Sequence, residues 1–435
     1  MSQPQTFIIQ GERQLSGELI VDGNKNAALP LIAATIATPG AVLLKRIPQI
    51  LDVQHMCDVL VHMGADVTIP EPDALLIDTS NLDPTQVNSH AWEAIRAAIL
   101  FVGPILSRFG KMTFPTPGGD VIGRRRLDSH FLAFKEMGAT IDAHNGEFSV
   151  LAPTSGLRPA QIFLDEASVT GTENALIAAA ATPGTTIIEN AACEPHVQDL
   201  TDYLCACGAT IEGRASNRLI VHGASVLTPP AAFVCGADYT QTGAFIGIAL
   251  CTNSELRIKQ AGTKYLKPIQ IGLEKFGATF RIDGDDVIVP KDQQLRVVED
   301  IGSNLAKLDS QPWPGFPSDM TSTAVILATQ TEGAILIHEK LYESRLFFTD
   351  KLVAMGARIT LCDPHRAIII GKTRLFGTNL TSPDIRAGIA LLTAALCANG
   401  TTRISNAQQI DRGFFEIEKK LASVGANIER LACEE

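Results

Sequence analysis

The chain has 435 residues, of which 46% are apolar and 19% charged, a composition that excludes a disordered protein and allows two or more domains with a large core. Its net charge of −11 excludes nucleic acid and anionic membrane surfaces as general partners, so any anion site must be local. The start lacks the layout of a signal peptide, and the strongest apolar runs are too short to span a bilayer. Nine cysteines include no C-x-x-C pair, and Cys205 and Cys207 lie among stretches typical of core, so we expect a reduced, cytoplasmic protein without a metal.

Six segments along the chain share one pattern, in which an Ala-rich, almost wholly apolar helix leads through a turn of small residues into a strand. Helices that are apolar on all sides are buried ones, so each segment predicts a core helix. In chain order the segments are 26–44, 96–114, 173–189, 243–258, 323–337 and 387–404.

A second repeated feature is a Gly-Ala pair that ends an amphipathic stretch and precedes a short β-prone run. This pattern predicts a helix closed by a C-terminal glycine, followed by a strand. Units of about 70 residues are too long for solenoid repeats and favour a small βα domain used six times, with helices inside and sheets outside. The glycines are Gly64, Gly138, Gly208, Gly277, Gly356 and Gly425.

Charged residues recur where the predicted buried helices begin. Because helix N-termini attract anions, a cation placed there is not explained by the helix dipole, and a shared anionic ligand explains it. The alternative is that these residues are solvated surface charges. That alternative stays open for any one residue, whereas the recurrence of such residues at the same place in several units favours the ligand. The residues are Lys25 and Asn26, Arg96, Asp319, and Asp384 with Arg386.

The stretch "PGGDVIGRRRLDSH" places one carboxylate, Asp120, after two glycines and beside three arginines. Asp120 is either a turn residue or an acid on a flexible loop. Other motifs are missing. The stretch "IIIGKTRLFG" ends like a nucleotide-phosphate loop, but Arg366, five residues before Gly371, stands where that loop needs glycine. No G-x-G-x-x-G follows a strand, which argues against a dinucleotide oxidoreductase.

Several motifs together resemble the enolpyruvyl transferase family, which includes UDP-N-acetylglucosamine enolpyruvyl transferase and 5-enolpyruvylshikimate-3-phosphate synthase. The resemblance runs nearly end to end and implies an α/β fold of two inside-out, barrel-like domains, each with three βα units, six in all. It implies a discontinuous C-terminal-type domain of residues 1–23 plus 237–435 and a domain of residues 24–236 with a mobile catalytic loop around 115–130. The active site is expected between them. The motifs are "GNKNAALP", "PGGDVIG", "ENAACEPHVQDL", "PWPGFPSDM", "YESRL", "DIRAG" and "IDRGF".

The family reaction moves the enolpyruvyl group of phosphoenolpyruvate to the 3-hydroxyl of UDP-N-acetylglucosamine and releases phosphate. It is the first committed step of peptidoglycan precursor synthesis, needs no cofactor or metal, and passes through a tetrahedral intermediate by addition and elimination. The implied partners are therefore phosphoenolpyruvate and a nucleotide sugar. This chemistry asks for a proton donor, a base near the hydroxyl, and cations around phosphate and carboxylate.

The resemblance assigns roles to individual residues. Asp120 would be the acid, Asp319 the base, and Lys25 and Arg412 catalytic cations. The phosphate would be held by Lys25, Arg125 and Arg412, and the carboxylate would face Arg345 and Arg386. The nucleotide sugar would contact Asn26, Arg96, Arg125, Arg126, Leu127, Asp128, Ser129, Ser168, Val169, Asp319 and Leu341.

The chain departs from the common family pattern in its nucleotide-binding half. Most members carry cysteine where Asp120 stands, although some carry aspartate, so we expect insensitivity to fosfomycin, which alkylates that thiol. Two other functions stay open: a paralogue that uses another nucleotide or nucleotide sugar, and a non-catalytic anion-binding homologue. The other departures are Thr170 for glycine, Glu166 for lysine, Arg126 for proline and Ser129 for leucine.

Overall fold

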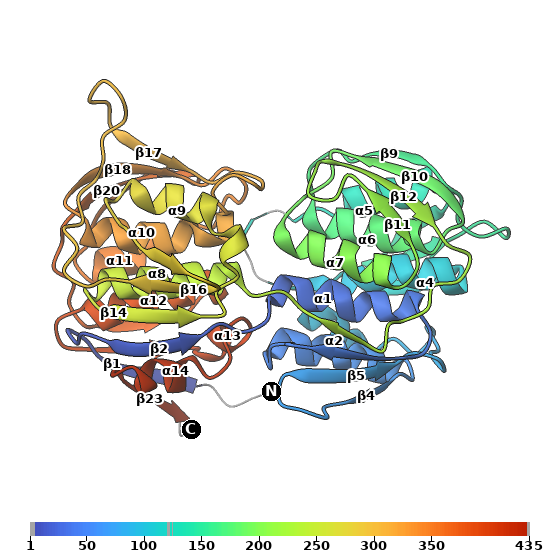
Figure 1. Ribbon diagram of the computed structural model, residues 1–435, viewed down its shortest axis with the longest axis horizontal. Coiled ribbons are helices and arrows are strands. Elements are labelled where there is room, and N and C mark those ends of the chain that lie inside the picture. The colour runs from blue at the N-terminus through green and yellow to red at the C-terminus, as the bar shows by residue number, and fades with distance from the viewer. Residues whose placement is uncertain (1–4, 120–121, 124, 433–435) are drawn as a thin grey trace. The chain divides into compact units, whose positions relative to one another are not determined.

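The computed structural model describes residues 5–119, 122–123 and 125–432. The chain divides into two compact units (Figure 1). Unit 1 comprises Met1–Asp22, Val121–Arg124 and Ala237–Glu435, and unit 2 comprises Gly23–Asp120 and Arg125–Gly236. Among the described residues, no helix combines the length and the apolar character that a membrane span requires.

Unit 1 contains three four-stranded sheets with one shared topology: a parallel pair at one edge and two antiparallel pairs. The first sheet has the order β15 (Arg281–Asp283), β16 (Asp286–Val289), β14 (Glu255–Lys259), β2 (Ser16–Ile20). The second is β17 (Ala306–Asp309), β18 (Gly333–His338), β20 (Arg366–Gly371), β19 (Arg358–Asp363). The third is β21 (Asn379–Thr381), β22 (Thr401–Ser405), β1 (Gln5–Gln10), β23 (Asn427–Ala432).

Unit 2 repeats this topology in two four-stranded sheets, and its third sheet has three strands. The four-stranded sheets are β13 (Ala232–Val234), β3 (Ala41–Lys45), β5 (Ala74–Asp78), β4 (Asp66–Thr68), and β11 (Thr210–Glu212), β12 (Arg218–Gly223), β10 (Gly184–Glu189), β9 (Gln161–Phe163). The third is β6 (Lys111–Pro115), β8 (Glu147–Leu151), β7 (Thr140–His144). The stretch 79–88, where the parallel edge strand would stand, is irregular, since Pro84 and Thr85 form a turn and the Asp83 carboxylate accepts from the Thr85 N–H at 2.9 Å.

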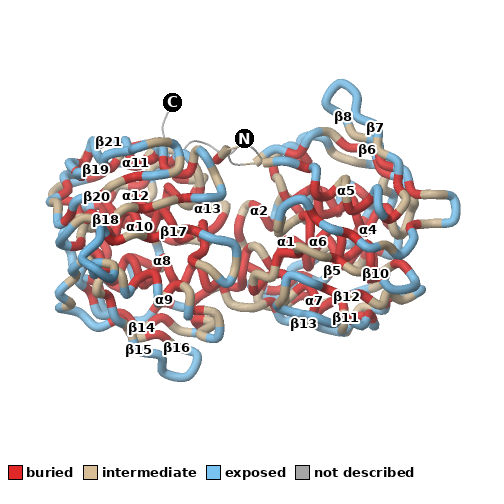
Figure 2. The backbone as a smooth tube through the Cα atoms, turned by 90° about the horizontal axis from the view of Figure 1, so that it is seen from above, coloured by how far each residue is buried: buried red, intermediate tan, exposed pale blue. Residues whose placement is uncertain are grey.

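The helices that follow the edge strands are buried inside each unit, as the apolar segments predict. All residues of α8 (Tyr239–Cys251) are buried, and alanines on these helices let the backbones approach closely. Figure 2 shows these helices largely buried and the hairpins at the sheet ends exposed. The others are α1 (Lys25–Ala34), α4 (Val102–Phe109), α6 (Val169–Ala180), α10 (Thr321–Gln330) and α12 (Ile385–Cys397). The amphipathic helices are α2 (Leu51–His62), α5 (Asp128–Glu136), α7 (Pro195–Ala206), α9 (Lys267–Glu274), α11 (Thr349–Ala354) and α14 (Ile417–Ser423).

The glycines of the six Gly-Ala pairs all adopt positive φ, between 69° and 110°. This left-handed conformation ends an amphipathic helix and would strain any residue with a Cβ atom. The prediction of six repeated units, each with one buried and one amphipathic helix, is confirmed.

The first two strands of the chain belong to sheets whose other strands come from the second half of the chain. β1 lies between β22 and β23 and pairs with both, and β2 pairs with β14 in parallel. In Figure 1 these blue strands accordingly lie among yellow and red elements. The N-terminal residues therefore complete unit 1 before the chain enters unit 2.

Two of the predicted buried helices begin with a tighter turn. The second starts as a 3-10 helix, η2 (Arg96–Phe101), and the fifth follows η4 (Ser318–Met320). In the second helix, the Gly103 N–H donates to Asn174 Oδ1 at 2.8 Å, and Pro104 has no N–H, so regular α-helical bonding is interrupted there.

Candidate active site

Lys25 is the first residue of α1 and is 9% exposed. Asn24 caps the helix by accepting hydrogen bonds from the backbone N–H groups of Asn26 (2.8 Å) and Ala27 (3.2 Å). The Lys25 Nζ lies 2.6 Å from Oδ2 of Asp52, a residue of α2 that is 2% exposed. The sequence pattern indicated an anionic ligand for this cation, whereas a carboxylate of the protein itself pairs with it. The missed signal was an acid in the first turn of an amphipathic helix, on its buried side.

Arg96 contacts the backbone of two described segments, 117–119 and 125–126. Its guanidinium donates to the carbonyl oxygens of Arg125, of Arg126 (3.1 Å) and of Pro117 (3.5 Å). Gly119 has φ 112°, and a Cβ there would lie 2.8 Å from the Arg96 Cβ. The backbone at Gly119 thus packs directly on Arg96, and the bond to the Arg125 carbonyl brings two predicted nucleotide-sugar residues, Arg96 and Arg125, together.

The predicted segment 126–129 lies against two carboxylates that follow β9. Arg126 forms ion pairs with Asp128 (Nε–Oδ2, 3.0 Å) and Asp165 (Nη2–Oδ2, 3.1 Å). The Ser129 hydroxyl, 1% exposed, donates to Asp165 at 2.9 Å and to Glu166 at 3.4 Å. Leu127 is buried. Two carboxylates therefore pair with one guanidinium on the predicted nucleotide side, and Glu166 adds a third carboxylate nearby. We call Arg126, Asp128, Asp165 and Glu166 the acidic cluster.

Ser168 and Val169 form the start of α6, where the Ser168 hydroxyl caps the helix by accepting from Gly171 N at 3.2 Å. The next residue, Thr170, bonds through its hydroxyl to His130 Nε2 at 3.1 Å. The other ring nitrogen of His130 lies 3.0 Å from Asn174 Nδ2. Burial, with Arg96 nearby, lowers the pKa of His130 to about 3, so the ring is neutral at ordinary pH. Sequence analysis missed His130 and Asn174 as the residues that join α5 and α6.

In unit 1, three residues predicted for the site converge. The Asp319 carboxylate, in η4, accepts from Arg345 Nη2 at 3.1 Å through Oδ1 and from Arg386 Nη2 at 2.7 Å through Oδ2. Arg345 is 5% exposed, and Arg386 stands in the first turn of α12, which Asp384 caps. The structure thus joins the predicted base directly to both cations predicted for the phosphoenolpyruvate carboxylate.

Glu339 joins the segments that bear these residues and was missed by sequence analysis. It is fully buried directly after β18, and its Oε2 accepts from Ser318 (2.9 Å) and Thr321 (2.7 Å), the residues on either side of the turn with Asp319. Its Oε1 accepts from the backbone N–H of Leu341 at 2.9 Å, in the segment that leads to Arg345. Leu341 itself is exposed.

Arg412 follows α13 (Gln408–Asp411), and its Nη1 donates to Gln409 Oε1 at 3.3 Å. Gly413 packs tightly on α12, because a Cβ there would lie 2.5 Å from Ile385 Cγ2. Ile385 is the neighbour of Arg386 in sequence, so the turn with Arg412 lies against the first turn of α12.

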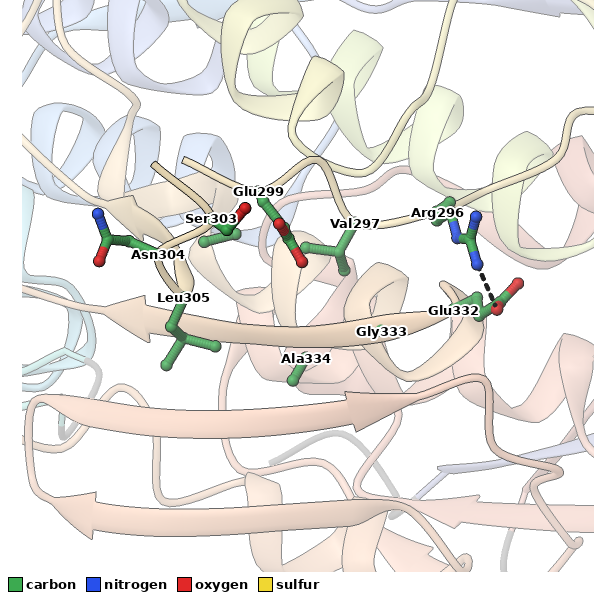
Figure 3. Close-up of a pocket in the computed structure, with 10 residues that line it drawn as sticks. Arg296, Val297, Glu299, Ser303, Asn304, Leu305, Glu332, Gly333 and Ala334 are labelled. Carbon is green, nitrogen blue, oxygen red and sulfur yellow. Dashed lines mark hydrogen bonds and ion pairs between the residues drawn. The ribbon is translucent and has the colours of Figure 1, made fainter. Parts of the chain in front are cut away.

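Asp120, the predicted acid, lies outside the described residues. A separate hollow of about 590 Å³ in unit 1 is lined by segments 296–299, 303–306 and 332–334, with the Arg296–Glu332 ion pair at one end (Figure 3). It includes none of the residues predicted for catalysis or binding. Within the described ranges, no three His, Cys, Asp or Glu side chains are grouped so as to hold a metal ion.

Comparison with known proteins identifies the family. The family model described as EPSP synthase (3-phosphoshikimate 1-carboxyvinyltransferase) matches residues 9–421. The chain belongs to this family. The resemblance inferred from the motifs is thereby confirmed.

Among curated relatives, the chain is similar to proteins named UDP-N-acetylglucosamine 1-carboxyvinyltransferase. It is 48% identical to the protein of Bradyrhizobium diazoefficiens over 98% of both chains. It is 46% identical to that of Treponema denticola, covering 97% of this chain and 98% of the relative, and 44% identical to that of Borreliella burgdorferi, covering 98% and 99%.

Solved structures of similar fold are also enolpyruvyl transferases. The enolpyruvyl transferase NikO from Streptomyces tendae superposes with a TM-score of 0.88 at 22% identity, covering 99% of this chain and 100% of that one. EPSP synthase from Acinetobacter baumannii gives a TM-score of 0.72 at 17% identity, covering 98% and 100%. These similarities confirm the predicted two-domain α/β fold.

Proposed function

We propose that this chain transfers the enolpyruvyl group of phosphoenolpyruvate to the 3-hydroxyl of UDP-N-acetylglucosamine and releases phosphate. The observation on which this rests is the 48% identity, over nearly the full length of both chains, to a UDP-N-acetylglucosamine 1-carboxyvinyltransferase. The reaction would be the first committed step of peptidoglycan precursor synthesis. A cytoplasmic location is supported by the free cysteines, since every described cysteine lacks a disulfide.

In this proposal Asp319 takes the proton from the sugar hydroxyl. The two guanidinium groups on its carboxylate fix its orientation, which a general base requires. Each guanidinium has five N–H donors, and the bond to Asp319 uses one of them in Arg345 and one in Arg386. The same arginines can therefore receive the carboxylate of phosphoenolpyruvate beside the base.

Lys25 and Arg412 are proposed to meet the phosphate group, whose charge changes during addition and elimination. Lys25 is positioned by the Asn24 cap and by its ion pair with Asp52, so its ammonium group is oriented before any ligand arrives. Preorganised cations of this kind stabilise developing charge because they need not reorganise during the reaction. Asp120 is proposed as the proton donor to the methylene carbon, on the sequence pattern alone.

The test is phosphate release from phosphoenolpyruvate by the purified chain, measured against a panel of nucleotide sugars and free nucleotides. We expect release with UDP-N-acetylglucosamine and little with the other compounds. Release with a different nucleotide alone would overturn the proposed acceptor and keep the enzyme class. Binding without release from any acceptor would favour the non-catalytic homologue.

A paralogue that uses another acceptor is the second candidate, and the acidic cluster favours it. With three carboxylates and one guanidinium, the formal charge of the cluster is 1 − 3 = −2. Negative charge beside Ser129 opposes the binding of a diphosphate. Glu166→Lys separates the candidates: if the acceptor is a nucleotide diphosphate sugar, this variant should lower its KM, whereas an acceptor without a diphosphate should bind no better.

A further inference from the structure

Arg430, on the C-terminal strand β23, makes an unusually complete set of contacts. Its Nη1 and Nη2 donate to the two Asp411 oxygens at 2.7 Å each, and its Nε and Nη2 donate to the two Glu418 oxygens at 2.9 and 2.8 Å. Its Nη1 also donates to Gln5 Oε1 on β1. A guanidinium has five N–H donors, so all five are used.

The guanidinium of Arg430 also lies over an aromatic ring. Arg430 pairs across the strands with Phe7, and its Cζ lies 4.6 Å from the centre of that ring. Phe7 is fully buried, and the side chains of Arg430 and Asp411 are 21% and 20% exposed. Arg430 thus makes paired contacts to two carboxylates while its guanidinium lies over an aromatic ring. These contacts fix the orientation of the guanidinium, and a lysine could not reproduce them. We call Arg430, Asp411, Glu418 and Gln5 the Arg430 cluster.

The two carboxylates of the Arg430 cluster bracket the turn that contains Arg412. Asp411 is the last residue of α13, immediately before Arg412, and Glu418 lies in the first turn of α14. Within the turn, Glu416 adopts φ 45°, which an L-residue avoids unless its surroundings hold it there. Together with the packing of Gly413 on Ile385, the cluster fixes both ends of this turn.

We infer that Arg430 is a positioning residue, which orients Arg412 for the phosphate group by holding Asp411 and Glu418. The inference rests on the proposed function, in which Arg412 binds that phosphate. Arg430 is itself saturated by protein groups, so it acts through Arg412 and not on the ligand.

The chain offers a matched control. Arg257 on β14 also joins two carboxylates, with Nε 2.8 Å from Asp286 and Nη2 2.9 Å from Asp283. These residues belong to a different sheet of unit 1, and none of them was predicted for the site. Arg257→Lys therefore makes the same chemical change in a comparable ion-pair cluster that does not hold Arg412.

The experiment measures the affinity of inorganic phosphate, from the phosphate-dependent rise in Tm, for wild type, Arg430→Lys, Asp411→Asn and Arg257→Lys. Losing a charge-assisted bond in the cluster should weaken phosphate binding about tenfold in the first two variants. Arg257→Lys should stay within about twofold of wild type, as surface substitutions do. Should Arg430→Lys fail to fold, Asp411→Asn and Glu418→Gln each keep part of the cluster and give the same comparison.

A double-variant cycle with Arg412→Lys separates positioning from general stability. If Arg430 acts through Arg412, then Arg430→Lys should add little loss of phosphate affinity once Arg412 is changed. Additive losses, unchanged affinity in Arg430→Lys, or an equal loss in Arg257→Lys would each overturn the inference. Turnover with phosphoenolpyruvate and UDP-N-acetylglucosamine, measured on wild type alongside, tests the proposed function separately, because phosphate affinity does not depend on the acceptor.

Discussion

Lys25 is a buried cation whose charge is balanced inside the protein by Asp52. If its ammonium group stabilises the phosphate as charge develops, Lys25→Ala should lower kcat by about 10²-fold or more, as the loss of other electrostatic donors does. The measurement is steady-state phosphate release, with the exposed Lys111→Ala as control. Near-normal kcat in Lys25→Ala would mean that the Lys25–Asp52 pair is purely structural.

Asp120, the proposed acid, is also the residue that we expect to decide sensitivity to fosfomycin. A carboxylate attacks an epoxide far less readily than a thiolate does, so wild type should turn over without covalent inactivation by fosfomycin. Asp120→Cys should keep activity and gain time-dependent inactivation, with one adduct per chain on the new thiol by mass spectrometry.

Asp120→Asn is the matched variant, since it keeps the shape and has no acid proton to transfer. It should lose most turnover and still bind ligand. An asparagine form with the wild-type rate would identify Asp120 as a turn residue.

His130 joins α5 to α6, and the low pKa of its ring makes the free energy of unfolding depend on pH. Burial and the nearby Arg96 lower its pKa from 6.5 to about 3 in the folded chain, so between these values only the unfolded chain binds a proton there. The stability from this ring is therefore fully present above pH 6.5 and is lost as pH falls towards 3.

His130→Gln should accordingly flatten the fall in the free energy of unfolding below pH 6.5, by up to about 1.4 kcal/mol per pH unit. Urea unfolding at a series of pH values measures it. His144→Gln is the control, because that side chain is 83% exposed. Equal slopes for wild type and His130→Gln would show that the ring does not titrate as stated.

Glu339 connects β18, η4 and the segment leading to Arg345. In Glu339→Gln the hydrogen bonds of this buried side chain lose the negative charge that strengthens them, so we expect a loss of about 2 kcal/mol in the free energy of unfolding. Turnover should fall as well, because the hydrogen bonds of Glu339 hold both the turn with Asp319 and the segment that leads to Arg345. Glu332→Gln, at an exposed ion pair, should change stability by less than about 0.5 kcal/mol. A Glu339→Gln variant as stable as wild type would contradict this account.

The strand order of the six sheets predicts which fragments of the chain can fold independently. All three sheets of unit 2 are built from strands within residues 23–236, whereas two sheets of unit 1 need β1 and β2. Residues 23–236 should therefore fold alone, with a cooperative unfolding transition by circular dichroism. Residues 237–435 should not, because the core would lose the buried side chains of Phe7, Ile9 and Leu19.

Joining residues 1–22 behind residue 435 through a short linker should restore folding of unit 1, since Gln5 pairs with Ala432 at that edge. The same fusion with Phe7→Asp should stay unfolded. Cooperative unfolding of residues 237–435 on their own would contradict the assignment of β1 to the core of unit 1.

The six repeats could be predicted because their signals are local. A helix apolar on all sides must be buried wherever it lies, and a glycine that ends a helix shows its function within a few residues. The motifs were equally local, so the family, the two-domain fold and the grouping of Asp319 with two arginines followed from short stretches of sequence.

Which groups pair with the charged side chains depends on the tertiary structure. Asp52 beside Lys25, Glu339 between two site segments, and Arg430 on Asp411 and Glu418 each pair groups that different elements bring within about 3 Å. An ion pair forms only where packing sets that distance, and packing depends on which strands join which sheet. The repeats, the buried helices and the family were therefore predictable from short stretches of sequence. The strands between which β1 lies and the internal counter-ions of the site depend instead on non-local pairing, which no short stretch of sequence encodes.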